Sequence, residues 1–217
     1  TTFVVVGEMN ETDHPLQTPP ISCCLLSTCS SVECICYIVQ LSSSSYRFEM
    51  ADGALINMTS PIAWALACPV CMSFMIRIAW PEATPRVTLA VIMLLEAVVL
   101  LGIVSGMTSN MTLKISTYVV ASILYILMVS IMYRGMFWTQ GKQRPQEARS
   151  IFYLFTGSWL IFPIVWLLGP NMLDAISYDV VLVMFAFGDV FAKNIFTFVG
   201  FKYTQAQIDA SSTMDTI

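Results

Sequence analysis

The chain has 217 residues, of which 57% are hydrophobic and only 11% are charged, and its mean hydropathy is +0.74. A soluble domain carries about 25% charged residues, so this composition excludes a soluble globular domain and a disordered chain. The net charge of −4, with no basic stripe, excludes a nucleic-acid-binding protein. A helical membrane protein remains. Because each crossing needs about 20 apolar residues, the length fits seven helices joined by short loops.

Six apolar stretches reach crossing length, and polar or turn-rich segments separate them. They are Ile21–Leu41, Ile62–Ala79, Val87–Met107, Leu113–Tyr133, Ile151–Leu168 and Asp179–Phe201. A shorter stretch, Thr1–Gly7, precedes them, and we expect it to be the remainder of a truncated first helix. A cleavable signal peptide is the alternative, but the basic n-region and full apolar core are missing. We therefore expect one seven-helix domain over 1–205 and a cytoplasmic tail over 206–217.

The basic residues predict the orientation in the membrane. If the N-terminus is outside, seven of them lie at cytoplasmic ends of the helices: Arg77, Arg86, Arg134, Lys142, Arg144, Arg149 and Lys202. Only Arg47 and Lys114 lie outside in that arrangement. Positive residues favour the cytoplasmic side. We expect an integral protein of the plasma membrane with its N-terminus extracellular and its C-terminus cytoplasmic.

Four ionisable side chains fall well inside the predicted spans: Glu33, Glu96, Asp189 and Lys193. Each is costly at that depth and therefore indicates a functional role. Asp189 lies four residues before Lys193, so the two share one helix face and the cation has a counter-charge within reach. A structural ion pair between helices is one interpretation. The other is a lysine that forms a Schiff base with an aldehyde cofactor.

The preceding span favours the cofactor. Trp159, Phe162, Pro163 and Trp166 stand at i, i+3, i+4 and i+7, which places them on one helix face with a kink. Beside a membrane lysine, such a face is suited to enclose a long conjugated ligand, although an aromatic stripe is also common in ordinary packing. His14 is the only histidine, so we expect no histidine-based metal site and no catalytic triad. We also do not expect the protein to be an enzyme.

The sequence resembles the microbial rhodopsins, which are seven-helix proteins with retinal on a lysine of the last helix. Gly188-Asp189-Val-Phe-Ala192-Lys193-Asn194 matches their seventh helix, and Trp159…Phe162-Pro163…Trp166 matches their sixth. In the third helix, Trp64-Ala-Leu-Ala67-Cys68-Pro69-Val70 is similar to the Trp-Leu-Leu-Thr-Cys-Pro segment of the channelrhodopsins. The stretch 46–53 is similar to a short extracellular hairpin of the natural anion channelrhodopsins.

The resemblance implies a role for each matching residue. All-trans retinal is bound to Lys193 as a protonated Schiff base, with Asp189 as its counterion. The residues that line the retinal site are Trp64, Cys68, Trp159, Phe162, Pro163, Trp166 and Ala192. The partners implied are the lipid bilayer, retinal, a permeating small ion and, because channelrhodopsins commonly dimerise, a second copy of the chain.

Departures from the family pattern narrow the function. Proton pumps carry a carboxylate, a threonine and a proton donor at third-helix positions that hold Ala63, Ala67 and Phe74 here. None of these three can transfer a proton, and Ser60 replaces the usual extracellular arginine. Outward proton pumping by the usual relay is therefore not expected.

A light-gated channel does not require this proton relay, because it needs only a polar path and a gate. The second helix keeps one carboxylate, Glu33, in the position of a channelrhodopsin gate, among hydroxyl residues such as Ser30 that suit an anion. Cys68 and Glu96 stand near the positions of a gating pair. We therefore predict a light-gated anion channel that conducts chloride. The alternatives are the sensory domain of a rhodopsin fused to a signalling enzyme, a cation-conducting channelrhodopsin and an atypical ion pump.

Overall fold

The computed structural model describes residues 59–138, 146–170 and 172–202, and short pieces of the chain before them (27–28, 30–32, 34–35, 38, 47–49 and 55–57). The predicted first-helix remainder, the predicted tail and Glu33 lie outside the described residues. The described residues between 27 and 38 are helical, within the second predicted span.

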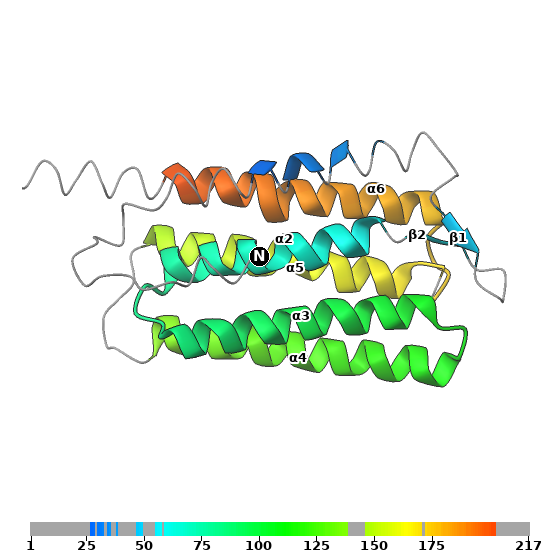
Figure 1. Cartoon of the computed structure of the whole chain (residues 1–217), viewed down its shortest axis with the longest axis horizontal. Coiled ribbons are helices and arrows are strands. Elements are labelled where there is room, and N and C mark those ends of the chain that lie inside the picture. Colours follow the sequence, from blue (N-terminus) through cyan, green and yellow to red (C-terminus); the bar gives the residue numbers. More distant parts are fainter. Residues whose placement is uncertain are drawn as a thin grey trace, which may run out of the picture.

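Five long helical segments lie side by side along one axis (Figure 1). They are α2 (Thr59–Ala79), α3 (Pro85–Met107), α4 (Met111–Phe137), α5 (Gln146–Leu168) and α6 (Tyr178–Asp189), which continues through the π-helical turn η3 (Val190–Ile195) as far as Lys202. Among the described residues, four segments are long and apolar enough to cross a membrane, and the described apolar part of α2, Ala63–Ala79, is shorter. The five predicted spans from Ile62 onward are thus confirmed as helices.

N-capping side chains explain where three of the helices begin. Thr84, Asn110 and Ser177 accept the backbone N–H of the residue three positions later in α3, α4 and α6. Such side chains satisfy backbone donors that the first helical turn leaves free. The loops that follow α2 and α3 are only a few residues long, so each helix runs antiparallel to the next and packs beside it.

Two short strands precede α2. Strand β1 (Arg47–Glu49) pairs antiparallel with β2 (Leu55–Asn57), and Arg47 stands opposite Asn57. This pairing lies at the end of the bundle where α2 begins (Figure 1). The segment 46–53, over which the sequence predicts a hairpin, contains the first of these strands.

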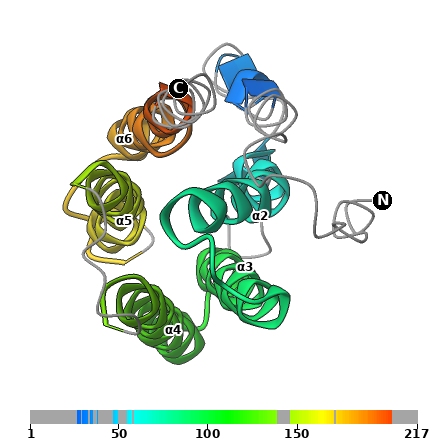
Figure 2. The same cartoon turned by 90° about the vertical axis from the view of Figure 1, so that its left-hand side faces the viewer.

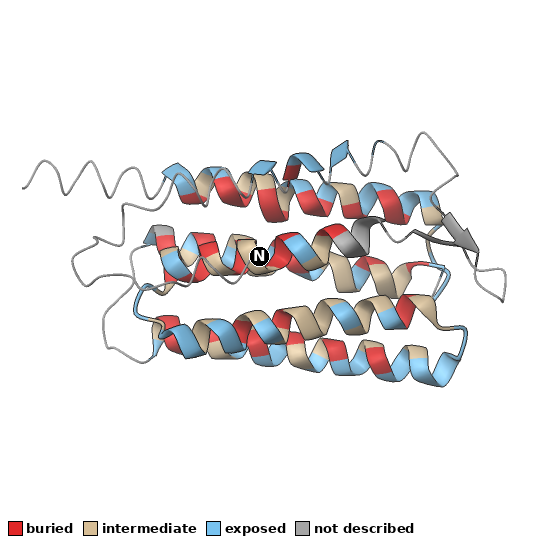
Figure 3. Cartoon of the chain, viewed as in Figure 1, coloured by how far each residue is buried: buried red, intermediate tan, exposed pale blue. Residues whose placement is uncertain are grey.

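Viewed end-on, α3, α4, α5 and the last helix form an arc, and α2 lies on its inner side (Figure 2). Buried residues form stripes on the inward faces, whereas large apolar residues such as Leu100, Ile126 and Phe187 are 55–63% exposed on the outward faces (Figure 3). Contiguous exposed apolar surface marks a surface that another apolar phase covers, and here that phase is the lipid bilayer. The interior contains an aromatic and methionine-rich core shared by α2, α3, α4, α5 and the last helix.

Candidate functional site

A buried ion pair lies in the last helix. Lys193 is 1% exposed and Asp189 is 4% exposed, and Nζ of the lysine lies 2.5 Å from Oδ1 of the carboxylate. Asp189 ends α6, and Lys193 lies in the π-helical turn that follows. Single π-helical turns inside α-helices are frequent at functional sites. Because a buried charge is stable only when it is paired and hydrogen-bonded, the two groups hold each other in place.

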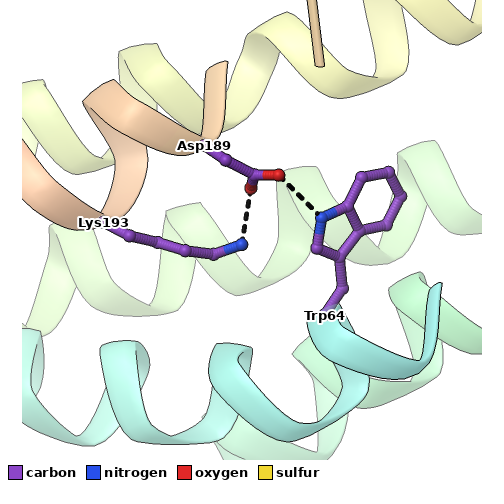
Figure 4. Close-up of polar contacts among 3 residues, drawn as sticks. All are labelled: Trp64, Asp189 and Lys193. Carbon is purple, nitrogen blue, oxygen red and sulfur yellow. Dashed lines mark hydrogen bonds and ion pairs between the residues drawn. The ribbon is translucent and has the colours of Figure 1, made fainter. Parts of the chain in front are cut away.

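The second oxygen of the same carboxylate has its own partner on another helix. Nε1 of Trp64 in α2 donates a hydrogen bond to Oδ2 of Asp189 over 3.0 Å (Figure 4). Asp189 therefore receives the ammonium group on one oxygen and the indole N–H on the other. A hydrogen bond to a charged group contributes more than one between neutral groups, so this contact orients the carboxylate and links α2 to the last helix.

Aromatic rings pack around the ion pair from three helices. Trp64 meets Phe162 and Phe185 edge-on, with ring centroids 5.3 and 5.2 Å apart. Trp166 stacks on Phe185, with the centroids 6.2 Å apart and the planes 17° from parallel. These edge-on and stacked arrangements are the favoured ones for aromatic pairs, so the rings form firm apolar walls.

A cavity of about 260 Å³ lies between these walls, and both members of the ion pair line it. Its lining includes eight of the residues that the sequence predicts for the retinal site: Trp64, Cys68, Trp159, Phe162, Pro163, Trp166, Asp189 and Lys193. Ala192 is fully buried but is not part of the lining. A long apolar aldehyde fits this site, because the walls are mostly apolar and aromatic while the amine and its counter-charge are part of the lining.

The positions of the pump relay are buried and apolar, as the sequence indicates. Ala63, Ala67 and Phe74 are 8%, 1% and 4% exposed. Ser60 lies in the first turn of α2, and its side chain is outside the described part of the structure. Ser30 is 4% exposed.

Glu96 lies at the middle of α3, half-buried. Its Oε1 is buried without a hydrogen-bond partner among the described residues. The pairing of Glu96 with Cys68 stays a prediction. Glu96 also does not line the cavity, whereas Cys68 does.

Sequence reasoning missed several residues of the site. Tyr118 and Tyr125 of α4 line the cavity and donate hydrogen bonds to backbone carbonyls of α5. Their spacing of seven residues on one helix face is a signal that could have identified them. Phe185, one turn before Asp189, is a third missed wall residue. Thr197, one turn after Lys193, is a buried polar residue outside the cavity lining and is 7% exposed.

Known proteins that are similar in sequence to this chain are rhodopsins. A family model described as bacteriorhodopsin-like protein matches residues 1–207. Sensory rhodopsin I of Haloarcula marismortui is 26% identical over 155 residues, which are 70% of this chain and 63% of that protein. The chain thus spans less than two thirds of the length of this relative.

Solved structures share the fold. The thermophilic rhodopsin from Rubrobacter xylanophilus is similar with a TM-score of 0.74 and 20% identity, over 88% of this chain and 90% of that one. The red light-activated channelrhodopsin Chrimson is similar with a TM-score of 0.68 and 16% identity, over 90% and 79% of the two chains. The chain belongs to the bacteriorhodopsin-like family, the microbial rhodopsins, and Lys193 is the lysine through which it binds retinal as a Schiff base.

Proposed function

We propose that this microbial rhodopsin is a light-gated anion channel that conducts chloride. The absence of the pump relay supports this proposal. Ala63, Ala67 and Phe74 leave the described part of α2 without a carboxylate that could accept or donate a proton. Within the described residues, the carboxylate bound to Lys193 comes from its own helix. A channel needs no such relay, because the ion moves down its own gradient.

The observation that carries the proposal is the presence of two buried hydroxyl groups, one in the second predicted span and one in the last helix. Oγ of Ser30 and Oγ1 of Thr197 are buried and have no hydrogen-bond partner among the described residues. Buried polar groups normally have a partner in the protein or in bound water. Such hydroxyls suit a hydrated path, and they can donate to an anion while adding no negative charge that would repel it.

The chain's own residues couple the retinal site to the helices around it. When bound, retinal supplies the absorption of visible light and a change of shape at Lys193. Asp189 holds the positive charge at the lysine nitrogen, and Trp64 holds the carboxylate from α2. A displacement at Lys193 therefore strains a contact that joins α2 to the last helix. Helix packings are bistable, so a small displacement of this kind biases one arrangement against another.

A closed gate in this account lies on the side of Lys193 toward the C-terminal end of the last helix. Phe196 contacts Phe74 and Phe155 through ring centroids 5.9 and 5.2 Å apart. All three rings are at most 4% exposed, and they come from α2, α5 and the last helix. An apolar constriction of this kind excludes water and ions. We therefore assign this aromatic plug, formed by Phe74, Phe155 and Phe196, as the barrier that opening must separate.

Three further parts of the proposal concern the whole protein. The protein lies in the plasma membrane. The basic residues support an extracellular N-terminus. The resemblance to channelrhodopsins supports a homodimer. Glu33 acts as the gate carboxylate of the second helix, and Glu96 with Cys68 modulates gating.

A sensory photoreceptor is the second candidate, because the curated relative described above is named a sensory rhodopsin. A sensor passes its signal to a protein partner or to a fused signalling domain and requires no conducting path. A whole-cell voltage clamp under light, with retinal supplied, separates the candidates. A channel gives a photocurrent that reverses with voltage, a pump gives current without a driving force, and a sensor gives a pigment without current.

A further inference from the structure

The retinal cavity reaches the outer surface of the protein between α4 and α5. Its lining includes Ile126 of α4 and both Leu160 and Ile164 of α5, which are 63%, 46% and 47% exposed. These side chains contact the cavity and at the same time lie on the outward face of their helices. The cavity therefore has a side mouth, which we define by these three residues. In a membrane, this mouth opens to the acyl chains of the lipid and not to water.

Two hydrogen bonds frame the mouth. Oη of Tyr118 donates to the carbonyl oxygen of Pro163 over 3.0 Å, and Oη of Tyr125 donates to that of Thr156 over 2.9 Å. The helices run in opposite directions, so the two bonds lie at the same register, seven residues apart on each helix. At 1.5 Å per residue, they are about 10 Å apart along the helices.

Only small side chains fill α4 between the two tyrosines on the cavity side. Ala121 and Ser122 both line the cavity there. Oγ of Ser122 donates to the carbonyl oxygen of Tyr118 over 2.9 Å, which satisfies its polar group within the helix. The opening between the two hydrogen bonds is therefore apolar and is not filled by a large residue of α4.

Helix α5 can bend at this mouth. Pro163 lies inside the helix and has no N–H, so the carbonyl of Trp159, one turn earlier, loses its usual helical hydrogen bond. Proline is a common cause of helix kinks. One tyrosine hydrogen bond joins α4 to α5 at Pro163 itself, and the other joins them at Thr156, about two turns earlier in α5.

We propose that retinal enters and leaves its site laterally from the bilayer, through the mouth between α4 and α5, and that the hydrogen bonds of Tyr118 and Tyr125 are latches that must break for it to pass. Retinal is a long apolar aldehyde, so it dissolves in the hydrocarbon of the membrane. The mouth gives it a route from that phase to Nζ of Lys193 along walls that are mostly apolar. This inference uses the retinal site and does not depend on the channel proposal.

The test is the time course of pigment formation after all-trans retinal is added to membranes that contain the retinal-free protein. Leu160→Trp and Ile164→Trp place a larger side chain over the mouth, and we expect each to slow the rise of visible absorbance several-fold relative to wild type. Ile123→Trp is the matched control, because Ile123 is 58% exposed on α4 and does not line the cavity. It should form pigment at the wild-type rate. Rates are normalised to the final absorbance, so protein that fails to fold does not count.

The latches are tested by the double variant Tyr118→Phe with Tyr125→Phe. It keeps both rings but removes both hydrogen bonds, and the expected rate is faster by roughly an order of magnitude, because each neutral hydrogen bond makes a modest net contribution. Wild-type rates in both tryptophan variants and in the double phenylalanine variant would overturn lateral entry. A wild-type protein that forms no pigment at all would instead contradict the retinal assignment.

Discussion

At the scale of single residues, one carboxylate with two partners organises the retinal site. Asp189 binds Nζ of Lys193 through one oxygen and Nε1 of Trp64 through the other. The first contact is local in sequence, so the i,i+4 spacing predicts it. The second joins residues 125 positions apart, and no local pattern could predict it. The sequence of the last two helices therefore predicts the retinal site. It does not predict that Trp64 orients the carboxylate of Asp189.

The first prediction concerns the lysine itself. Lys193→Ala removes the amine that binds retinal and leaves Asp189 buried without its ammonium partner. We expect complete loss of the visible absorption band after retinal is added. Spectroscopy of the purified protein checks this. A coloured protein with the wild-type band would show that another residue binds the chromophore.

The second prediction concerns the indole of Trp64. Trp64→Phe keeps an aromatic wall but removes the hydrogen bond to Oδ2 of Asp189, and a hydrogen bond to a charged group contributes about 1.5–3 kcal/mol. We expect the pigment to bleach at a lower temperature. Trp159→Phe is the control, because its Nε1 has no hydrogen-bond partner among the residues described. Equal loss of thermal stability in both variants would mean that ring size, and not the hydrogen bond, matters at Trp64.

At the scale of helices, a glycine of α3 determines how closely an aromatic ring of α5, which lines the cavity, can approach. Gly106, near the end of α3, contacts the ring of Trp166 in α5, and a Cβ added there would lie 2.5 Å from two ring atoms. Trp166 lines the cavity and stacks on Phe185. The position of this wall thus depends on the absence of a side chain on a neighbouring helix.

The third prediction follows from that contact. Gly106→Ala should force the ring of Trp166 to move, at a cost of about 1–3 kcal/mol for overpacking, and should lower pigment yield or shift the absorption maximum. Gly157→Ala is the matched control, because nothing lies within 4 Å of the added Cβ. It should keep the wild-type spectrum. An unchanged spectrum and melting temperature in Gly106→Ala would contradict the tight packing of α3 on α5.

The fourth prediction concerns the aromatic plug between α2, α5 and the last helix. Phe74→Ala empties the space that its ring fills beside Phe196 and Gly200, and such truncations cost about 3–5 kcal/mol. We expect water and small nucleophiles to reach the retinal linkage more easily, so hydroxylamine should bleach the pigment faster. Phe198→Ala, which removes a ring that is 62% exposed on the outward face, should not change the rate. Equal bleaching rates in both variants would show that the plug is not the barrier.

At the scale of the whole molecule, the sequence predicts the bundle well because its signals are long and local. Apolar stretches of crossing length predict α3 and α4, since composition alone determines them. The side mouth of the cavity could not be predicted, because it depends on the register of α4 against α5 that Tyr118 and Tyr125 set through distant carbonyls. The plug was also missed as a unit, since Phe74, Phe155 and Phe196 come from three helices far apart in the chain.

The central claim is that light opens an anion path through this bundle. The most direct test is the reversal potential of the photocurrent before and after most of the external chloride is replaced by a large impermeant anion. A chloride channel predicts a shift toward positive potentials that approaches about 59 mV for a tenfold change in the chloride ratio, the value for a single charge. A photocurrent whose reversal potential stays fixed when chloride is replaced, or a pigment without photocurrent at any voltage, would contradict the account.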